Sequence, residues 1–248
     1  MKKGLSIIVV IVMITTLLFC NSIPGSADSI PVYESLDAIT LDGDISDWST
    51  ASDPHTMTLY ADGTGPGTLK VDYYMTHYAS SIYFALVYVD LSSHQGDYGG
   101  FLVTIGYTGS ETWSELNRDV LIIKGSGTIE DNFNDNSDLS DDDWDTTLGG
   151  TNDVTGGKNH NGTHYILELC KRLDSDDSDY DFSLAVNDLA LLSPIVNDQG
   201  VDYYWAQSTE IQEILISDHT YSEMPMIFLP IFFVTSILFI YFKKIKKN

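Results

Sequence analysis

Two neighbouring runs in the middle of the chain alternate with a two-residue period, and this alternation constrains the fold more than any other feature. The runs are TLKVDYYMTHY, residues 68–78, and SIYFALVYVD, residues 81–90, both rich in β-branched and aromatic residues. The residues YASS between them suit a tight turn. The pair therefore predicts a β-hairpin.

Similar short runs recur along the rest of the chain and are separated by clusters of Gly, Asp, Asn and Ser. They are HTMTLYA (55–61), GGFLVTIGY (99–107), RDVLIIKGSG (118–127), THYILELCK (163–171), YDFSLAVND (180–188) and EIQEILIS (210–217). No stretch of this region has a convincing helical period. The pattern predicts an all-β, antiparallel β-sandwich of the immunoglobulin-like or jelly-roll-like kind. Residues 131–162, rich in Asp, Asn and Gly, are expected to form a long pair of loops.

Both ends of the chain have the composition of membrane-targeting segments. Two lysines and an apolar run predict a signal peptide over residues 1–27. A charge-free apolar stretch, residues 224–242, predicts one transmembrane helix over residues 223–242, and the lysine-rich residues 243–248 after it indicate the cytoplasmic side. We therefore expect a single-pass cell-membrane protein whose residues 28–222 form one extracellular domain.

This expected domain is strongly acidic. All 36 Asp and Glu residues lie in it or at its border, whereas only six of the 12 Lys and Arg residues do, so its formal charge is −30. Nucleic acid is thereby disfavoured as a partner, while cations, neutral sugars or a basic protein remain open. The charge could equally serve solubility alone. Cys170 is the only cysteine of the domain, which precludes an internal disulfide.

Two sets of side chains are candidates for ligand binding by their chemistry. Trp113, Trp144 and Trp205 could provide aromatic platforms for a sugar, although tryptophans of small sandwiches more often belong to the core. Asp138, Asp142 and Asp145 fall in an acidic stretch with the alternating oxygen spacing of a Ca²⁺ loop. Leu139 stands where an EF-hand needs glycine, so a solvated acidic loop is the simpler interpretation.

Two stretches together resemble a known superfamily. LDGDISDWS, residues 41–49, is similar to the opening of family 9 carbohydrate-binding modules and DOMON domains. THYILELCKRLDSDDSDYDFSLAVND, residues 163–188, is similar to a later motif of the ethylbenzene dehydrogenase-like haem-binding domains, which have a Glu-containing strand, an Asp-rich turn and a further strand. The resemblance spans residues 39–217 and implies a β-sandwich that holds b-type haem, a sugar or no known ligand.

The haem-binding branch implies a particular set of ligands. Its members hold iron through a methionine from the first half and a His or Lys from the second half of the domain. The matching residues here are Met57 or Met75, together with Lys158, His160 or His164. A thioether with an imidazole or amine can ligate haem iron axially. Strand methionines, however, more often fill a hydrophobic core.

The sequence contains none of the common catalytic motifs, so we expect a non-enzymatic domain. The leading hypothesis is a haem-binding accessory of electron transfer with a possible redox partner. The alternatives are a carbohydrate-binding surface module and a structural or adhesion domain without a small ligand.

Asn161-Gly162-Thr163 has the form of an N-glycosylation acceptor. Trp48 and the Asp42-Gly43 turn are expected to be structural.

Overall fold

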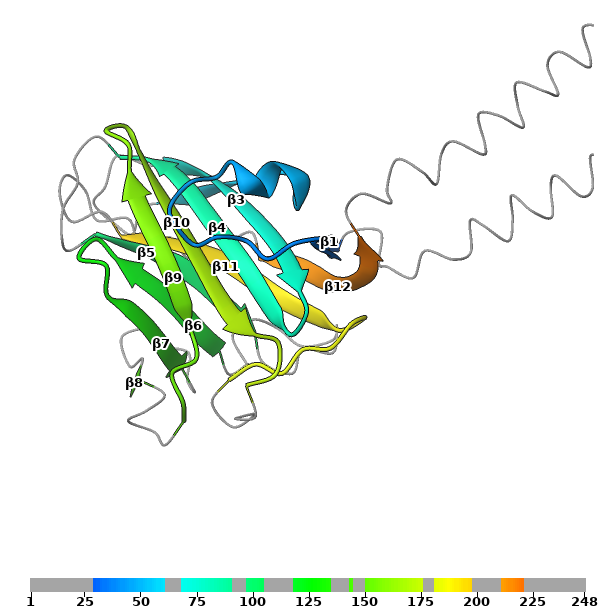
Figure 1. Cartoon of the computed structure of the whole chain (residues 1–248). Coiled ribbons are helices and arrows are strands. Elements are labelled where there is room, and N and C mark those ends of the chain that lie inside the picture. The colour runs from blue at the N-terminus through cyan, green and yellow to red at the C-terminus, as the bar shows by residue number, and fades with distance from the viewer. Residues whose placement is uncertain are drawn as a thin grey trace, which may run out of the picture.

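A computed structural model of the chain describes residues 29–60, 68–90, 97–104, 118–134, 143–144, 150–175, 181–197 and 211–220. These residues form twelve strands and one short 3₁₀ helix, which spans Asp47–Thr50. The strands stack in two layers (Figure 1). The prediction of an all-β chain is thus confirmed. Strand pairing joins all twelve strands in one nearly closed sheet, which is consistent with the expected sandwich, and the two layers are called the first and the second sheet below.

The first sheet is antiparallel throughout and carries the expected hairpin. Its strand order is β2 (His55–Tyr60), β3 (Thr68–Tyr78), β4 (Ser81–Val89), β10 (His164–Arg172) and β9 (Thr155–His160). Strands β3 and β4 pair from Val71 with Tyr88 to Tyr78 with Ser81, which confirms the hairpin. Ala79 in the turn has a positive φ of 53°.

The second sheet contains the remaining strands. Its order is β8 (Asp143–Trp144), β7 (Ile129–Asn134), β6 (Arg118–Lys124), β5 (Tyr98–Thr104), β11 (Leu189–Asn197), β12 (Gln212–Thr220) and β1 (Ile30–Glu34). Neighbours are antiparallel except β1 and β12, which are parallel. An irregularity after Val32 lets Glu34 pair with His77 of β3, so β1 links the two sheets.

The hydrophobic core lies between the two sheets. Each sheet contributes alternate residues to it, as the two-residue period requires. Members from the first sheet include Tyr73, Phe84 and Leu167, and members from the second include Phe101 and Leu121, all at most 2% exposed. The alternating apolar residues of the sequence therefore form the inward faces of both sheets.

Two local predictions were wrong. Residues 131–162 were expected to be loops, yet they contain the end of β7, all of β8 and all of β9. The run YDFSLAVND was expected to be a strand, yet its described part makes only one bridge, between Asp174 and Ser183. The strand lies directly after it, as β11.

Strand β11 was not predicted because Pro194 interrupts its apolar sequence, LALLSPIVN. Proline cannot donate a ladder hydrogen bond, so it is normally confined to strand edges. In this sheet β11 pairs with β12 only from Leu189 to Leu192. Pro194 lies beyond the described part of that pairing and is paired in register with Phe101 of β5.

In the part of the chain that the structure describes, no helix is long and apolar enough to cross a membrane. The predicted signal peptide and the predicted span over residues 223–242 lie outside the described residues. Both remain predictions.

Candidate functional site

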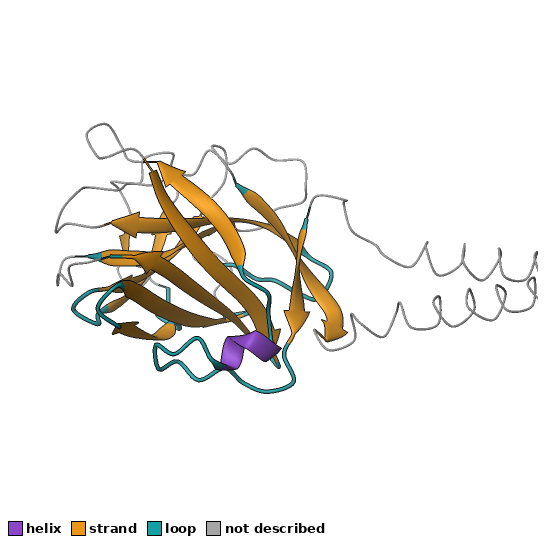
Figure 2. Cartoon of the chain, turned by 90° about the horizontal axis from the view of Figure 1, so that it is seen from above, coloured by secondary structure: helices purple, strands orange, loops and turns teal. Residues whose placement is uncertain are grey.

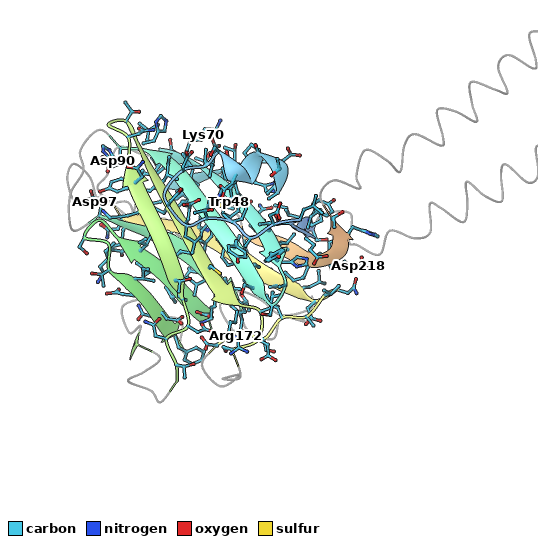
Figure 3. The ribbon with its side chains drawn as sticks, viewed as in Figure 1. Trp48, Lys70, Asp90, Asp97, Arg172 and Asp218 are labelled. Carbon is cyan, nitrogen blue, oxygen red and sulfur yellow. The ribbon has the colours of Figure 1, made fainter. Side chains whose placement is uncertain are left out.

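The opening motif lies on the outer face of the first sheet, where one buried carboxylate holds it. Glu168 on β10 accepts a hydrogen bond from the Trp48 indole Nε1 at 2.7 Å and another from the Gly43 backbone N at 2.5 Å. Glu168 and Trp48 are both fully buried. The 3₁₀ helix that carries Trp48 is seen on the surface of the sandwich in Figure 2, and Figure 3 labels Trp48 over this sheet.

Two glycines allow the segment before Trp48 to lie directly on strand β9. A Cβ on Gly157 would clash with the carbonyl oxygen of Leu41, and one on Gly43 would clash with Asn159. Gly43 also has a φ of 76°, a conformation that side chains rarely adopt. The turn expected at Asp42-Gly43 is thus present, with Asp42 Oδ1 accepting from the Asp44 N at 2.9 Å.

Burial governs the electrostatics of this outer face. Burial raises the pKa of Glu168, while the hydrogen bonds from Trp48 and Gly43 partly oppose the shift. On β4, burial and the neighbouring Cys170 raise the pKa of Tyr83 to about 12. Trp48, Tyr83, Ala85, Ile39 and Ala51 form an apolar cluster here. The motif is therefore a packed and hydrogen-bonded part of the fold, as expected for Trp48.

The predicted haem ligands occupy several separate places. Met57 and Met75 are each 2% exposed and belong to the core between the sheets. His160 Nε2 donates to the Asp90 carbonyl oxygen at 2.9 Å, and the centre of its ring lies 4.8 Å from the centre of the Tyr165 ring. Figure 3 labels Asp90 at the end of the sandwich opposite Arg172.

Lys158 and His164 are engaged by local partners. Lys158 Nζ donates to the Gly125 carbonyl oxygen in the β6–β7 turn and lies 5.8 Å from the centre of the Tyr165 ring. His164 Nδ1 lies 2.8 Å from the Thr163 hydroxyl. His160 pairs across the strands with Tyr165, so His164 is on the opposite face of the sheet.

The strand register separates Met57 from His160, one of the second set of candidate ligands. Met57 and His160 are in one cross-strand row, through Val71, Tyr88 and Tyr165. Four strand spacings make that separation roughly 19 Å. Two axial haem ligands must bind the same iron atom. The described strands therefore do not bring Met57 and His160 together.

The side chains of the candidate sugar and calcium ligands lie outside what the structure describes. Trp113, Trp205, Asp138, Asp142 and Asp145 lie outside the described residues. Trp144 belongs to β8 and pairs in register with Asn132. These residues keep the status of predictions.

A second charged cluster was missed by the sequence analysis. Lys171 on β10 points into the sandwich, and its Nζ lies 2.9 Å from both carboxylate oxygens of Asp131, 3.0 Å from Asp153 and 3.3 Å from Asp119. Asp181 also accepts from this ammonium. We call these five residues the Lys171 cage. The alternation of Leu167, Leu169 and Lys171 was the signal that could have predicted a buried lysine.

Three members of the Lys171 cage, namely Lys171, Asp119 and Asp131, have strongly shifted pKa values. Burial raises the pKa of Asp119 well above its ordinary value, and it raises the pKa of Asp131 to about 6; Lys171 opposes both shifts. Burial by itself would lower the pKa of Lys171, but Asp119 and Asp131 outweigh it and raise that pKa. Lys171 thus holds its ammonium charge firmly, whereas Asp119 and Asp131 hold their carboxylate charges less firmly.

Comparison with known proteins identifies the fold. No known family profile matches the sequence, and no curated protein matches it. Several solved structures are similar, and three of them are described here. A family 9 carbohydrate-binding module from Caldicellulosiruptor kristjanssonii in complex with cellotriose is 10% identical, with a TM-score of 0.50 over 78% of this chain and 96% of that one.

The other two structures give the same result. The Caldicellulosiruptor kristjanssonii family 9 module in complex with glucose is 11% identical, with a TM-score of 0.50 over 77% of this chain and 98% of that one. A putative carbohydrate-binding protein from Bacteroides uniformis is 7% identical, with a TM-score of 0.52 over 77% of this chain and all of that one. The chain thus has the fold of family 9 carbohydrate-binding modules, as the first resemblance implied. A closer relationship to the haem-binding members stays a prediction.

Proposed function

We propose that the chain is a non-catalytic glycan-binding domain displayed on the outer surface of a cell membrane. The observation that carries this proposal is the two-sheet sandwich, whose fold is shared with modules solved in complex with cellotriose and with glucose. A neutral sugar is also compatible with a chain of net charge −24, which would repel an anionic ligand.

The structure narrows the choice of aromatic residues that could stack on a sugar ring. Trp48 is excluded because it is fully buried and its indole N–H is bonded to Glu168. We infer that the platform comes from Trp113, Trp144 or Trp205, the three remaining tryptophans of the sequence. Such stacking surfaces are typical of carbohydrate sites because an aromatic ring covers the apolar face of a sugar.

Calorimetric titration of the purified full chain with glucose and cellotriose tests the proposal. We expect Trp113→Ala, Trp144→Ala or Trp205→Ala to weaken binding at least tenfold, while Trp48→Phe lowers stability and leaves the affinity of the folded fraction unchanged. A glycan array extends the search to other neutral oligosaccharides. Failure to bind any glycan, or binding that all three alanine variants retain, would refute the proposal.

Haem remains a separate prediction with a direct test. Adding haemin to the full chain and recording the visible spectrum reveals any Soret band. Met57→Leu and Met75→Leu conserve volume, so loss of a Soret band in either variant would identify an iron ligand. Because both methionines are packed in the core, we expect neither variant to alter the spectrum.

A further inference from the structure

The Lys171 ammonium lies against the Asp131 carboxyl group inside the sandwich, and both side chains are fully buried. Lys171 Nζ is 2.9 Å from Oδ1 and 2.9 Å from Oδ2 of Asp131. An atom equally close to both oxygens of a carboxyl group faces the carbon between them. Nζ therefore lies roughly 3–3.5 Å from Asp131 Cγ, the separation of two atoms that are positioned to react.

Asp119 is placed to take a proton from Lys171. Its Oδ2 lies 3.3 Å from Nζ, and its side chain is fully buried. Burial raises the pKa of Asp119 well above its ordinary value; Lys171 opposes the rise, and Asp131 and Asp181 add to it. A lysine becomes a nucleophile only as the neutral amine. The proton that Lys171 must lose therefore has a neighbouring acceptor and does not have to reach water.

The Asp131 carboxyl group has a hydrogen-bond donor at one of its two oxygens. The Asp153 backbone N donates to Asp131 Oδ2 at 3.1 Å. A fixed backbone N–H stabilises the negative charge that develops on a carbonyl oxygen when a nucleophile attacks its carbon. Oδ1 is then the oxygen that can leave. Burial also raises the pKa of Asp131 to about 6, with Lys171 opposing, so this group is more readily protonated than an ordinary aspartate.

We propose that Lys171 and Asp131 condense to an intramolecular amide, an isopeptide bond between the two sheets. Lys171 transfers one ammonium proton to Asp119, and the freed electron pair of Nζ attacks Asp131 Cγ. The Nζ–Cγ bond forms. Asp131 Oδ1 takes back the proton from Asp119 and a second proton from Nζ, and the Cγ–Oδ1 bond breaks as water leaves. The reaction consumes only groups of this chain, and exclusion of water protects the product from hydrolysis.

The other members of the Lys171 cage hold the ammonium in place for this reaction. Asp181 accepts from Nζ through Oδ1, and Asp153 Oδ1 lies 3.0 Å from it. Among the residues that the structure describes, only Asp131 bonds Nζ through both oxygens. The Phe182 ring, whose centre is 5.7 Å from Nζ, adds an apolar wall. Asp131 is therefore the carboxyl group whose carbon faces the amine.

The position of the bond gives it a structural role. Lys171 belongs to β10 of the first sheet and Asp131 to β7 of the second. The two residues are 40 positions apart, and closing a loop of this length stabilises a fold by constraining the unfolded chain. Figure 3 labels Arg172, the next residue after Lys171, at the end of the sandwich opposite Asp90. The bond thus joins the sheets at that end, in a domain whose single cysteine cannot form an internal disulfide.

A tryptic map of the full chain tests this inference and does not depend on how the chain ends are processed. We expect residues 125–158, which contain Asp131, to be joined to residues 159–172, uncut after Lys171 and lighter by one water than the two peptides together. Fragmentation assigns the bond to one residue. Recovery of both peptides unlinked would overturn the proposal, and so would a bond to Asp153 or Asp181.

Intact mass spectrometry of variants provides the controls. Lys171→Met should have the full mass of its sequence, whereas the unaltered chain should have lost one water. Lys124→Met is the matched control, because Lys124 also pairs with an acid, Glu130, but its side chain is 37% exposed. This variant should still lose the water. Loss of a water from Lys171→Met would refute the assignment to Lys171.

The role of Asp119 has its own kinetic test. Asp119→Asn cannot accept the proton, so loss of water from freshly synthesised chain should be at least about a hundredfold slower than in the unaltered chain. Asp218→Asn, whose carboxylate is 62% exposed, should react at the unaltered rate. An Asp119→Asn chain that reacts equally fast would overturn the proton transfer. Should Asp119→Asn fail to fold, the tryptic map of the unaltered chain still decides whether the bond exists.

Discussion

Replacing Glu168 by Gln should destabilise the domain by breaking the attachment of the opening motif. The carboxylate accepts from Trp48 Nε1 at 2.7 Å and from the Gly43 N at 2.5 Å, one donor on each oxygen. A glutamine amide has one acceptor oxygen, so one of these buried donors must lose its partner. Orphaning a buried donor costs about 1–3 kcal/mol, and we expect a loss of about 2 kcal/mol.

Trp48→Phe removes the indole donor and leaves Gly43 bonded. If the two residues act through the shared hydrogen bond, a double-mutant cycle with Glu168→Gln should give a coupling energy of about 1–2 kcal/mol. Urea unfolding followed by circular dichroism gives the unfolding free energies of the unaltered chain, the two single variants and the double variant. Additive effects within about 0.5 kcal/mol would show that the bond contributes nothing specific.

The pH dependence provides an independent check. Burial raises the pKa of Glu168 above its ordinary value of 4.5, so the folded state holds this proton more tightly than the unfolded chain does. The stabilising contribution of this raised pKa to the unfolding free energy is therefore fully present below pH 4.5 and is lost as the pH rises through the folded-state pKa of Glu168. Glu168→Gln does not titrate, so its deficit relative to the unaltered chain should shrink as the pH rises. A deficit that grows with pH would contradict the reasoning.

Three further predictions concern packing and ionisation. Gly157→Ala should lower the unfolding free energy by about 3 kcal/mol because its Cβ would clash with the Leu41 carbonyl oxygen. Gly162→Ala should lower it by only about 1 kcal/mol, because the new Cβ meets no atom within 4 Å and only the positive φ is unfavourable. Urea unfolding of both variants compares the two losses. Tyr83→Phe should remove a phenol that titrates near pH 12 in ultraviolet absorbance. Met75→Leu should change the unfolding free energy by less than about 1.5 kcal/mol.

The sequence predicts a strand well where its alternation coincides with burial on one side. Strands β3 and β4 satisfied this condition, and so did β6, where Leu121 and Ile123 face the core. Strand β9 did not, because its sequence TGGKNH has the composition of a loop. Its glycines are required by neighbours that are distant in sequence. A Cβ on Gly156 would lie 2.5 Å from the Glu168 carbonyl oxygen, and Gly157 lies under Leu41.

The site was less predictable than the fold for a related reason. Periodicity could place Lys171 on the inward face of β10, but it could not choose the carboxylates that meet it. Asp119 and Asp181 are two of 36 acidic residues, and they reach Lys171 only through pairing that the local sequence does not encode. The same limit applied to the candidate haem ligands, because only the register of five strands shows that Met57 and His160 are far apart.

Strand β10 shows why such polar contacts matter for the fold itself. Its apolar residues occur on both faces: Leu167 and Leu169 face the core, while Ile166 is also buried, on the outer face. Hydrophobicity therefore distinguishes the two faces of β10 only weakly. Its two buried charges distinguish them strongly, because Glu168 bonds outward to the opening motif and Lys171 bonds inward to the cage.

A register slip of one residue would exchange these faces. Glu168 would then enter an interior that already holds Asp119 and Asp131, and Lys171 would leave its carboxylates for the indole and amide donors that now bond Glu168. Both changes bury unpaired charge, which is far costlier than exchanging one apolar side chain for another. The two polar contacts of β10 thus favour one register of the β10–β4 pair. Glu168 connects β10 to the opening segment on the outer face, and Lys171 connects it to the second sheet on the inner face.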